Sequence, residues 1–268
     1  MSDVSAPAVS SPPSRRRWQF SLRTFLLAVL LIGCGLRVGW VLFERDMATK
    51  QAELVAAIRK RGKVGWTRVP SLRGSWTVFL LGDNANSQVD TVELRYPFDL
   101  DAILSRLGRL PDLKHLAIYF DLSEAQMAMI ARLQHLKSLE FRDRSMTDEG
   151  LSCLVRMTEL ESLKLRDASP QITITGLAYL QYLPKLRVLE MYRPDITDDE
   201  LATLSQLNQL EELRLAYTRN ITDKGLLHLT RLQHLRVLEI RSRYISRDCR
   251  DKMEQALPKC QFYWEWID

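Results

Sequence analysis

The sequence has few of the residues from which metal sites, disulfide frameworks and catalytic centres are built. It contains only four cysteines and four histidines in 268 residues. The cysteines (Cys34, Cys153, Cys249 and Cys260) lie far apart and form no Cys-x-x-Cys pair, so neither a zinc site nor a disulfide framework is predicted. Cys249 and Cys260 could approach each other in the last repeat, but two buried free thiols are the favoured interpretation.

Catalytic motifs are also missing. The chain has no serine elbow, no phosphate-binding glycine loop, no His-Glu-x-x-His and no dinucleotide-binding glycine motif. The histidines are dispersed at His115, His135, His228 and His234. His135 and His234 precede equivalent leucines, which indicates a structural preference. We therefore expect no enzymatic activity, no cofactor and no bound metal.

Little positive charge remains once the N-terminal segment is set aside. The whole chain carries a formal charge of +5. Residues 1–43 account for +4, because they hold five arginines and the single acid Asp3, which leaves +1 for residues 44–268. A nearly neutral domain has little affinity for phosphate backbones. Nucleic acid is therefore not an expected partner.

The N-terminal segment predicts a membrane anchor. Residues 1–17 form a tail rich in Ser, Pro and Ala that ends in basic residues, and we expect it to be disordered. Residues 18–43 are mainly apolar, and as a helix they would reach about 39 Å, enough to cross a bilayer core of about 30 Å. Trp18 and Trp40 suit the two interfaces. Positive charge before the helix predicts a single-pass protein with a cytoplasmic N-terminus and an extracytoplasmic (periplasmic) main domain.

Two alternatives to an uncleaved anchor remain open. Leu31-Ile32-Gly33-Cys34 resembles a lipobox, which would make Cys34 a lipidated N-terminus. Against this, apolar sequence resumes after Cys34, where a lipoprotein would begin a polar tether. A cleaved signal peptide is less favoured, since no convincing small-x-small site follows the apolar core.

A leucine-based triplet of the form L-x-x-L-x-L recurs seven times. Its first positions are 24, 23, 24, 26, 24 and 25 residues apart, within the period of leucine-rich repeats. The triplets are Val89/Val92/Leu94, Leu113/Leu116/Ile118, Leu136/Leu139/Phe141, Leu160/Leu163/Leu165, Leu186/Leu189/Met191, Leu210/Leu213/Leu215 and Leu235/Leu238/Ile240. Each triplet predicts one strand.

A helical half follows each triplet. Blocks such as Ile221-Thr222-Asp223-Lys224-Gly225-Leu226 precede leucines at three-residue spacing, which keeps one stripe of a helix apolar. Thr197 with Glu200, and Ser123 with Gln126, are predicted capping boxes. The recurring aspartates Asp148, Asp198 and Asp223 could in principle bind calcium. Their position at helix starts favours a capping role instead.

These units predict an α/β fold: a leucine-rich-repeat solenoid with a concave parallel β-sheet and convex helices, preceded by one transmembrane helix. A single strand and helix cannot bury their apolar faces alone, but stacked units can. We expect repeats over residues 89–248. Residues 44–88 would form an N-terminal cap, with an amphipathic helix at 47–61 and a strand at 76–81. Residues 249–268 would form a C-terminal cap, whose alternating aromatics predict a strand covering the last repeat rather than a partner-binding patch.

The repeat consensus carries a family resemblance. The recurring Ile-Thr-Asp-x-Gly-Leu followed by spaced leucines resembles the cysteine-containing class of leucine-rich repeats, found in F-box substrate adaptors and many bacterial proteins. The run at 17–27 (Arg-Trp-Gln-Phe-Ser-Leu-Arg-Thr-Phe-Leu-Leu) is similar to the N-termini of membrane-anchored repeat proteins of planctomycete-type bacteria. The chain has no F-box-like domain before the repeats and no invariant asparagine after the strand. The resemblance implies protein binding and supplies no catalytic residues.

The strand residues that face away from the leucines define the candidate binding surface. Charges alternate in sign between the second and third apolar positions from Glu140 onward, so each should lie beside its opposite on the neighbouring strand. The two positions after the triplet are rich in Arg and Tyr, which are over-represented in interface hot spots. The candidate partner-binding residues are Arg95, Tyr119, Arg142, Arg166, Tyr192, Arg193, Tyr217 and Arg241.

The predicted function is protein–protein interaction in the cell envelope. The expected ligand is a protein or peptide bound to the concave sheet face, with the membrane contacted through residues 18–43. A structural, self-assembling envelope spacer and a polysaccharide-binding module are the alternatives.

Overall fold

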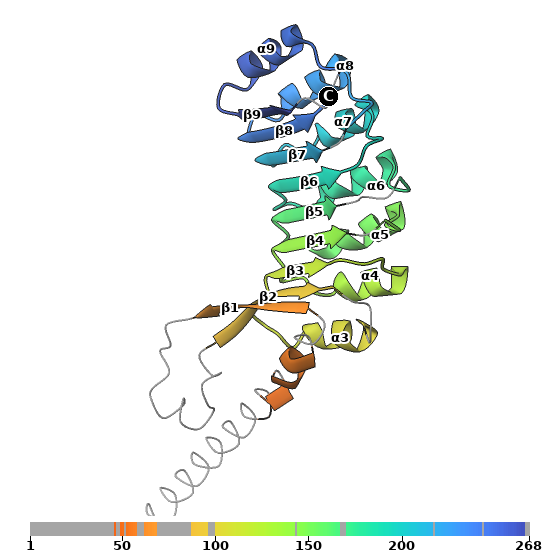
Figure 1. The fold of residues 1–268 in the computed structure, drawn as a ribbon, viewed down its shortest axis with the longest axis vertical. Helices are drawn as coiled ribbons and strands as arrows, with labels where there is room; N and C mark the ends of the chain where they lie inside the picture. The colour runs from red at the N-terminus through yellow and green to blue at the C-terminus, as the bar shows by residue number, and fades with distance from the viewer. Residues whose placement is uncertain are drawn as a thin grey trace, which may run out of the picture. The chain divides into compact units, whose positions relative to one another are not determined.

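The structure is a computed structural model, shown in Figure 1, that describes most of the repeat region. The described residues are 46, 49–50, 52–57, 62–68, 87–95, 100–142, 144–166, 170–216, 218–242 and 244–265. The chain divides into two compact units, Met1–Met47 and Ala48–Asp268, and the second is the subject below. The predicted tail, the anchor at 18–43, the strand at 76–81, Cys34 and Tyr217 all lie outside the described residues.

The described part of the chain contains no helix with the length and apolar character needed to cross a bilayer. Since the predicted anchor at 18–43 falls outside that part, it stays a prediction.

The second unit is built on one sheet of nine strands that follow each other in chain order. β1 and β2 are antiparallel, and every later neighbouring pair from β2 to β9 is parallel. The strands are β1 Gly62–Arg68, β2 Ser87–Leu94, β3 His115–Ile118, β4 Ser138–Arg142, β5 Ser162–Arg166, β6 Val188–Tyr192, β7 Glu212–Ala216, β8 Val237–Arg241 and β9 Gln261–Glu265.

A helix follows each strand from β2 to β8, and these helices line one face of the sheet (Figure 1). Short 3-10 turns extend three of them. The elements are α3 Leu100–Leu107, α4 Glu124–Ile130, α5 Asp148–Cys153, η2 Leu154–Arg156, α6 Ile174–Ala178, η3 Tyr179–Tyr182, α7 Asp198–Leu204, α8 Asp223–His228, η4 Leu229–Arg231 and α9 Arg247–Ala256. The predicted solenoid of repeated strand–helix units is confirmed.

The leucine triplets lie in register across the sheet. Leu139 is paired with Leu163, which is paired in turn with Leu189, then Leu213 and Leu238. All five side chains are fully buried. Every repeat thus contributes the same layer of leucines, and the repeats share one continuous core.

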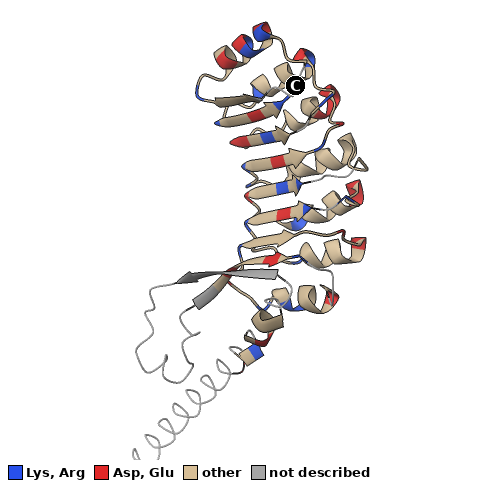
Figure 2. Cartoon of the chain, in the orientation of Figure 1, with Lys and Arg blue, Asp and Glu red and all other residues tan. Residues whose placement is uncertain are grey.

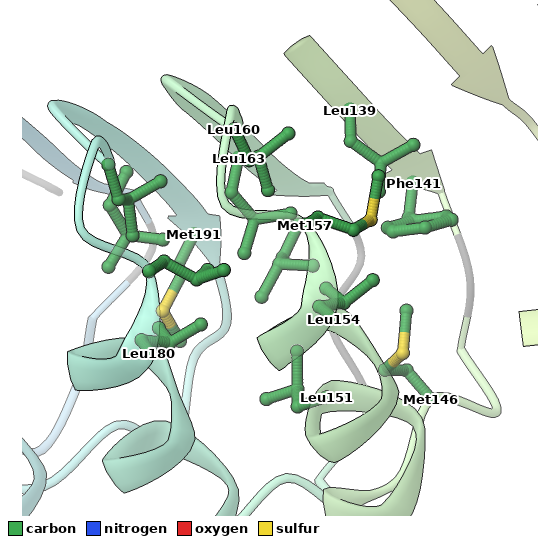
Figure 3. Close-up of a cluster of buried hydrophobic side chains, with 14 of the residues drawn as sticks. Leu139, Phe141, Met146, Leu151, Leu154, Met157, Leu160, Leu163, Leu180 and Met191 are labelled. Atoms are coloured by element: carbon green, nitrogen blue, oxygen red, sulfur yellow. The ribbon is translucent and has the colours of Figure 1, made fainter. Parts of the chain in front are cut away.

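The helical half of each repeat fills the space behind these leucines. Figure 3 shows Leu151, Leu154 and Met157, from α5 and the turn after it, directed toward the side chains of the strands. All three are fully buried. This contact explains the three-residue spacing of apolar positions after each helix start.

Hydroxyl side chains cap the N-termini of several helices. The capping boxes predicted for Ser123 with Gln126, and for Thr197 with Glu200, are both present. Thr147 caps α5 through the Gly150 N–H, and Ser246 caps α9 through the Cys249 N–H. These caps satisfy backbone donors that would otherwise lack partners in the first turn.

The recurring aspartates Asp148, Asp198 and Asp223 each link their own helix to the next one. The Asp198 carboxylate accepts the backbone N–H of Thr222 at 2.9 Å and its hydroxyl at 2.6 Å. Asp223 accepts the corresponding groups of Ser246 at 2.8 and 2.5 Å. The sequence predicted a role at the aspartate's own helix start. The hydrogen bonds show that it also fixes the start of the following helix.

The two ends of the unit differ from the predicted caps in detail. Residues 52–57 are helical with Leu54 and Val55 buried, in agreement with part of the predicted helix at 47–61. Strand β1, which the sequence analysis missed, pairs with β2. At the other end β9 forms as predicted, with Phe262 and Trp264 partly buried against the core. Cys249 and Cys260 are both free thiols.

Candidate functional site

The candidate site is the face of the sheet opposite the helices, called here the open sheet face. It carries the strand residues that alternate with the buried leucines. Two rows of these residues carry the argument. The first row is Glu93, Ala117, Glu140, Lys164, Glu190, Arg214 and Glu239, and the second is Arg95, Tyr119, Arg142, Arg166, Tyr192, Ala216 and Arg241.

The first row alternates in charge from strand to strand, as predicted. The register places Lys164 between Glu140 and Glu190, and Arg214 between Glu190 and Glu239. Figure 2 shows the alternation of red and blue along β4 to β8. Two pairs of neighbouring residues in this row form ion pairs: Lys164 with Glu190 at 3.3 Å, and Arg214 with Glu239 at 4.0 Å. The first row therefore carries charges of both signs side by side and does not form a single-sign patch.

Glu190 is the centre of a buried polar cluster on this face. Its side chain is only 4% exposed, and it receives a 2.5 Å hydrogen bond from the Tyr192 hydroxyl as well as the Lys164 ion pair. Burial alone would raise the pKa of Glu190, but Tyr192, Lys164 and Arg166 together lower it. Burial and the Glu190 contact raise the pKa of Tyr192 to about 12. Glu190 is thus held ionised by donors from three strand positions.

The second row is ordered by stacking between arginine and tyrosine. The guanidinium groups of Arg95 and Arg142 lie 5.3 and 5.7 Å from the centre of the Tyr119 ring. Arg166 lies 5.4 Å from the Tyr192 ring and also pairs with Glu140 at 3.0 Å. Cation–π contacts of this kind contribute about 0.5–1 kcal/mol each at exposed sites. The sequence predicted the band but did not show that its members stack on one another.

Of the next two predicted band members, one stays on the open sheet face and the other does not. Arg241 pairs with Glu239 at 3.3 Å and remains on the open sheet face. Arg193 is only 3% exposed, pairs with Glu200 and Asp195, and donates to the Ile172 carbonyl. Its assignment to an exposed binding band was wrong, because it follows the strand and turns into the protein. Tyr217 lies outside the described residues.

A separate set of ion pairs lies at the positions just before the strands. The sequence analysis did not predict these pairs. Lys137 pairs with Glu161 at 2.7 Å, and Arg187 pairs with Glu211 at 2.7 Å. Glu211 also contacts Arg236 of the following repeat at 3.6 Å. The signal was present in the sequence, since these residues recur at one repeat position with alternating sign. Exposed ion pairs of this kind stabilise a protein by only about 0–1 kcal/mol each. They therefore support the packing of one repeat on the next and do not define a ligand site.

The side chains of the open sheet face are suited to packing contacts and hydrogen bonds. Within the described ranges, no group of three or more His, Cys, Asp or Glu side chains is arranged to hold a metal ion. His115 begins β3, and His228 ends α8 on the opposite side of the sheet. These histidines are separated by the sheet and do not form a common cluster.

Comparison with known proteins finds similar solved structures at low sequence identity. No protein-family profile matches the sequence, and no curated protein matches it. Similar solved structures are leucine-rich-repeat proteins. An internalin (inlF) from Listeria monocytogenes is 20% identical with a TM-score of 0.47, covering 73% of this chain and 52% of its own. Internalin C2 of the same bacterium is 19% identical with a TM-score of 0.44, covering 67% and 74%.

A leucine-rich-repeat protein of Leptospira interrogans is 16% identical with a TM-score of 0.39, covering 59% of this chain and 44% of its own. The present chain spans about half the length of the inlF chain. At these identities the likeness concerns the fold alone. The resemblance to the cysteine-containing repeat class and to planctomycete-type proteins therefore stays a prediction.

Proposed function

We propose that this protein is a binding module that holds a protein or peptide partner on its open sheet face. The observation that carries the proposal is the stack in which Tyr119 lies between Arg95 and Arg142. Arginine and tyrosine are among the residue types enriched at interface hot spots. A side chain already held by its neighbours loses less conformational entropy when a partner binds.

The charge pattern favours a protein partner over a simple polyanion. Every charged residue of the first row from Lys164 to Glu239 has an oppositely charged neighbour on the next strand. Paired charges give specificity through complementary placement and give little long-range attraction. The expected ligand is therefore a polypeptide with both acidic and basic groups.

The membrane anchor belongs to the same proposal. Residues 18–43 would tether the solenoid, with the N-terminus cytoplasmic and the repeats extracytoplasmic, and a lipid on Cys34 is the alternative form of attachment. The support is the apolar sequence and the basic residues before it. Protease treatment of intact spheroplasts tests it, since the repeats should be digested and the N-terminal tail protected. Digestion of the tail with protected repeats would contradict the orientation.

Partner binding is tested by capture from an envelope extract of the source organism, with the detergent-solubilised full chain as bait. The double variant Tyr119→Ala, Arg142→Ala removes the tyrosine that directly follows β3 and the arginine that ends β4. The matched control is Arg132→Ala, Tyr182→Ala, which removes the same residue types from exposed positions on the helical side. We expect one protein to be retained by the parent and control chains and lost by the stack variant. Equal retention by all three would refute the proposed surface.

A further inference from the structure

The last strand of the sheet has an edge with no partner strand among the described residues. β9 pairs with β8 on one side and is the final strand in the sheet order. An open edge presents backbone donors and acceptors that can pair with another strand. Proteins that keep such an edge unpaired often place proline or lysine in it, and β9, with the sequence Gln-Phe-Tyr-Trp-Glu, contains neither.

The backbone groups at that edge are those of Phe262 and Trp264. The Gln261 N–H donates to the Arg236 carbonyl at 2.7 Å, so the backbone of Gln261 faces β8. In a strand the backbone groups of successive residues point to opposite edges. Tyr263 therefore also faces β8, whereas the N–H and C=O groups of Phe262 and Trp264 point to the open edge.

The side chains of β9 are chemically symmetric about Tyr263. Phe262 and Trp264 flank it on the core side, where their rings stack with centroids 5.2 Å apart and an angle of 9° between planes. Gln261 and Glu265 are the polar residues at either end. Tyr263 itself is 51% exposed on the open sheet face. A strand with this order presents the same pattern of polar and aromatic residues when it is read in either direction.

We propose that the occupant of this edge is a second copy of the chain, whose β9 pairs antiparallel with the first about a twofold axis through Tyr263. Tyr263 then lies opposite Tyr263 of the second copy, and Phe262 lies opposite Trp264. Each Phe262–Trp264 pair exchanges two backbone hydrogen bonds, because those are the groups that face the edge. The contact is isologous, so it closes at two copies.

A register shifted by one residue between the two β9 strands is disfavoured, because successive side chains of a strand point to opposite faces of the sheet. A slip of one residue would place the aromatic pair of one copy opposite polar residues of the other and would turn the second copy's helices to the opposite face. In the centred register both helical layers lie on the same side. Phe262 and Trp264 then extend the apolar layer across the junction, and both open sheet faces remain accessible.

A charge-swap experiment tests this register. The full chain in detergent is studied by sedimentation velocity over a range of concentrations, and Tyr263→Lys and Tyr263→Glu variants are compared with Tyr182→Lys on the helical side. Like charges directly opposite each other weaken strand pairing, so each Tyr263 variant alone should dimerise about two- to fivefold more weakly. An equimolar mixture of the two should dimerise again, because lysine then faces glutamate. Tyr182→Lys should behave as the parent chain.

Oxidative cross-linking provides a second measurement. It can detect the dimer even if the substitution at position 263 weakens dimerisation. Directly opposed residues that do not exchange hydrogen bonds have Cα atoms about 4.5 Å apart, within the range that a disulfide spans. Tyr263→Cys should give a covalent dimer that the parent chain and Tyr182→Cys do not. A chain that stays monomeric at all concentrations would overturn the proposal. So would a dimer that is indifferent to the charge at position 263, as expected if the N-terminal segment alone drove association.

Discussion

The carboxylate of Asp148 lies directly over Gly176 of the next repeat. A Cβ atom on Gly176 would stand 2.1 Å from Asp148 Oδ1, which is too close for any real contact. The same carboxylate accepts the Thr173 N–H at 2.7 Å and the Thr173 hydroxyl at 2.6 Å. The Asp148 carboxylate thus accounts for two residues of the next repeat: Thr173, which donates hydrogen bonds to it, and Gly176, which leaves room for it.

The first prediction concerns the glycine. Gly176→Ala should lower the free energy of unfolding by about 1–3 kcal/mol, because the added methyl group must displace a carboxylate that is fixed by two hydrogen bonds. Gly108→Ala is the matched control, since its nearest neighbouring atom would be 3.9 Å away. Urea unfolding followed by circular dichroism measures both. Equal stability of the two variants would contradict the steric explanation.

The second prediction couples the two residues. Asp148→Ala removes two hydrogen bonds and should cost about 1–3 kcal/mol. Asp199→Ala also removes a first-turn acid but leaves the inter-repeat bonds in place, so it should cost only about 0.3–1 kcal/mol. In the Asp148→Ala background, Gly176→Ala should cost less than it does alone. Strict additivity in this double-mutant cycle would show that the two residues are independent.

The third prediction concerns the buried pair of Arg193 and Glu200. Arg193→Met leaves a buried carboxylate without its cation and should destabilise the protein by about 3–5 kcal/mol. The double variant Arg193→Met, Glu200→Met should be markedly more stable than the single one, since no uncompensated charge remains. Thermal unfolding of the three chains gives the comparison. A double variant as unstable as the single one would argue that the arginine acts mainly through the Ile172 carbonyl.

The fourth prediction is a loss of stability in acid. The contacts around Glu190 and Asp223 lower the pKa of both carboxyl groups. A lowered pKa in the folded state means that stability is complete above the ordinary carboxyl range and is lost as the pH falls through the folded-state pKa. Glu190→Gln should therefore flatten the acid limb of the stability curve. Glu254→Gln, on the exposed side of α9, should leave the limb unchanged, and an unaltered curve for both would count against this role of Glu190.

The sequence sufficed for the repeat architecture because the physics there is local and periodic. Leu139, Leu163 and Leu189 recur at the spacing of the strands, and this spacing alone assigns their side chains to the core. The capping boxes were predictable for the same reason, since Thr197 and Glu200 lie three residues apart. The alternating charges of the first row followed from the register that the leucines set.

The misassignment of Arg193 has a three-dimensional cause. Ile174 stands where Asp148, Asp198 and Asp223 stand in their repeats, so no aspartate reaches the start of α7. Glu200 then occupies the position that Gly176 and Gly225 hold elsewhere, and Arg193 turns inward to pair with it. This exchange depends on which repeat lies next to which. Strand β1 escaped prediction because Gly62–Arg68 lacks the leucine triplet.

Hydroxyl-radical footprinting of the protein with its captured partner tests the binding surface most directly. The account predicts that partner binding protects Tyr119 and Tyr192 on the open sheet face, while Tyr182 and Tyr244, both largely exposed elsewhere, are oxidised as before. Protection of Tyr182 with unchanged oxidation of Tyr119 would place the partner on the helical side and contradict the account.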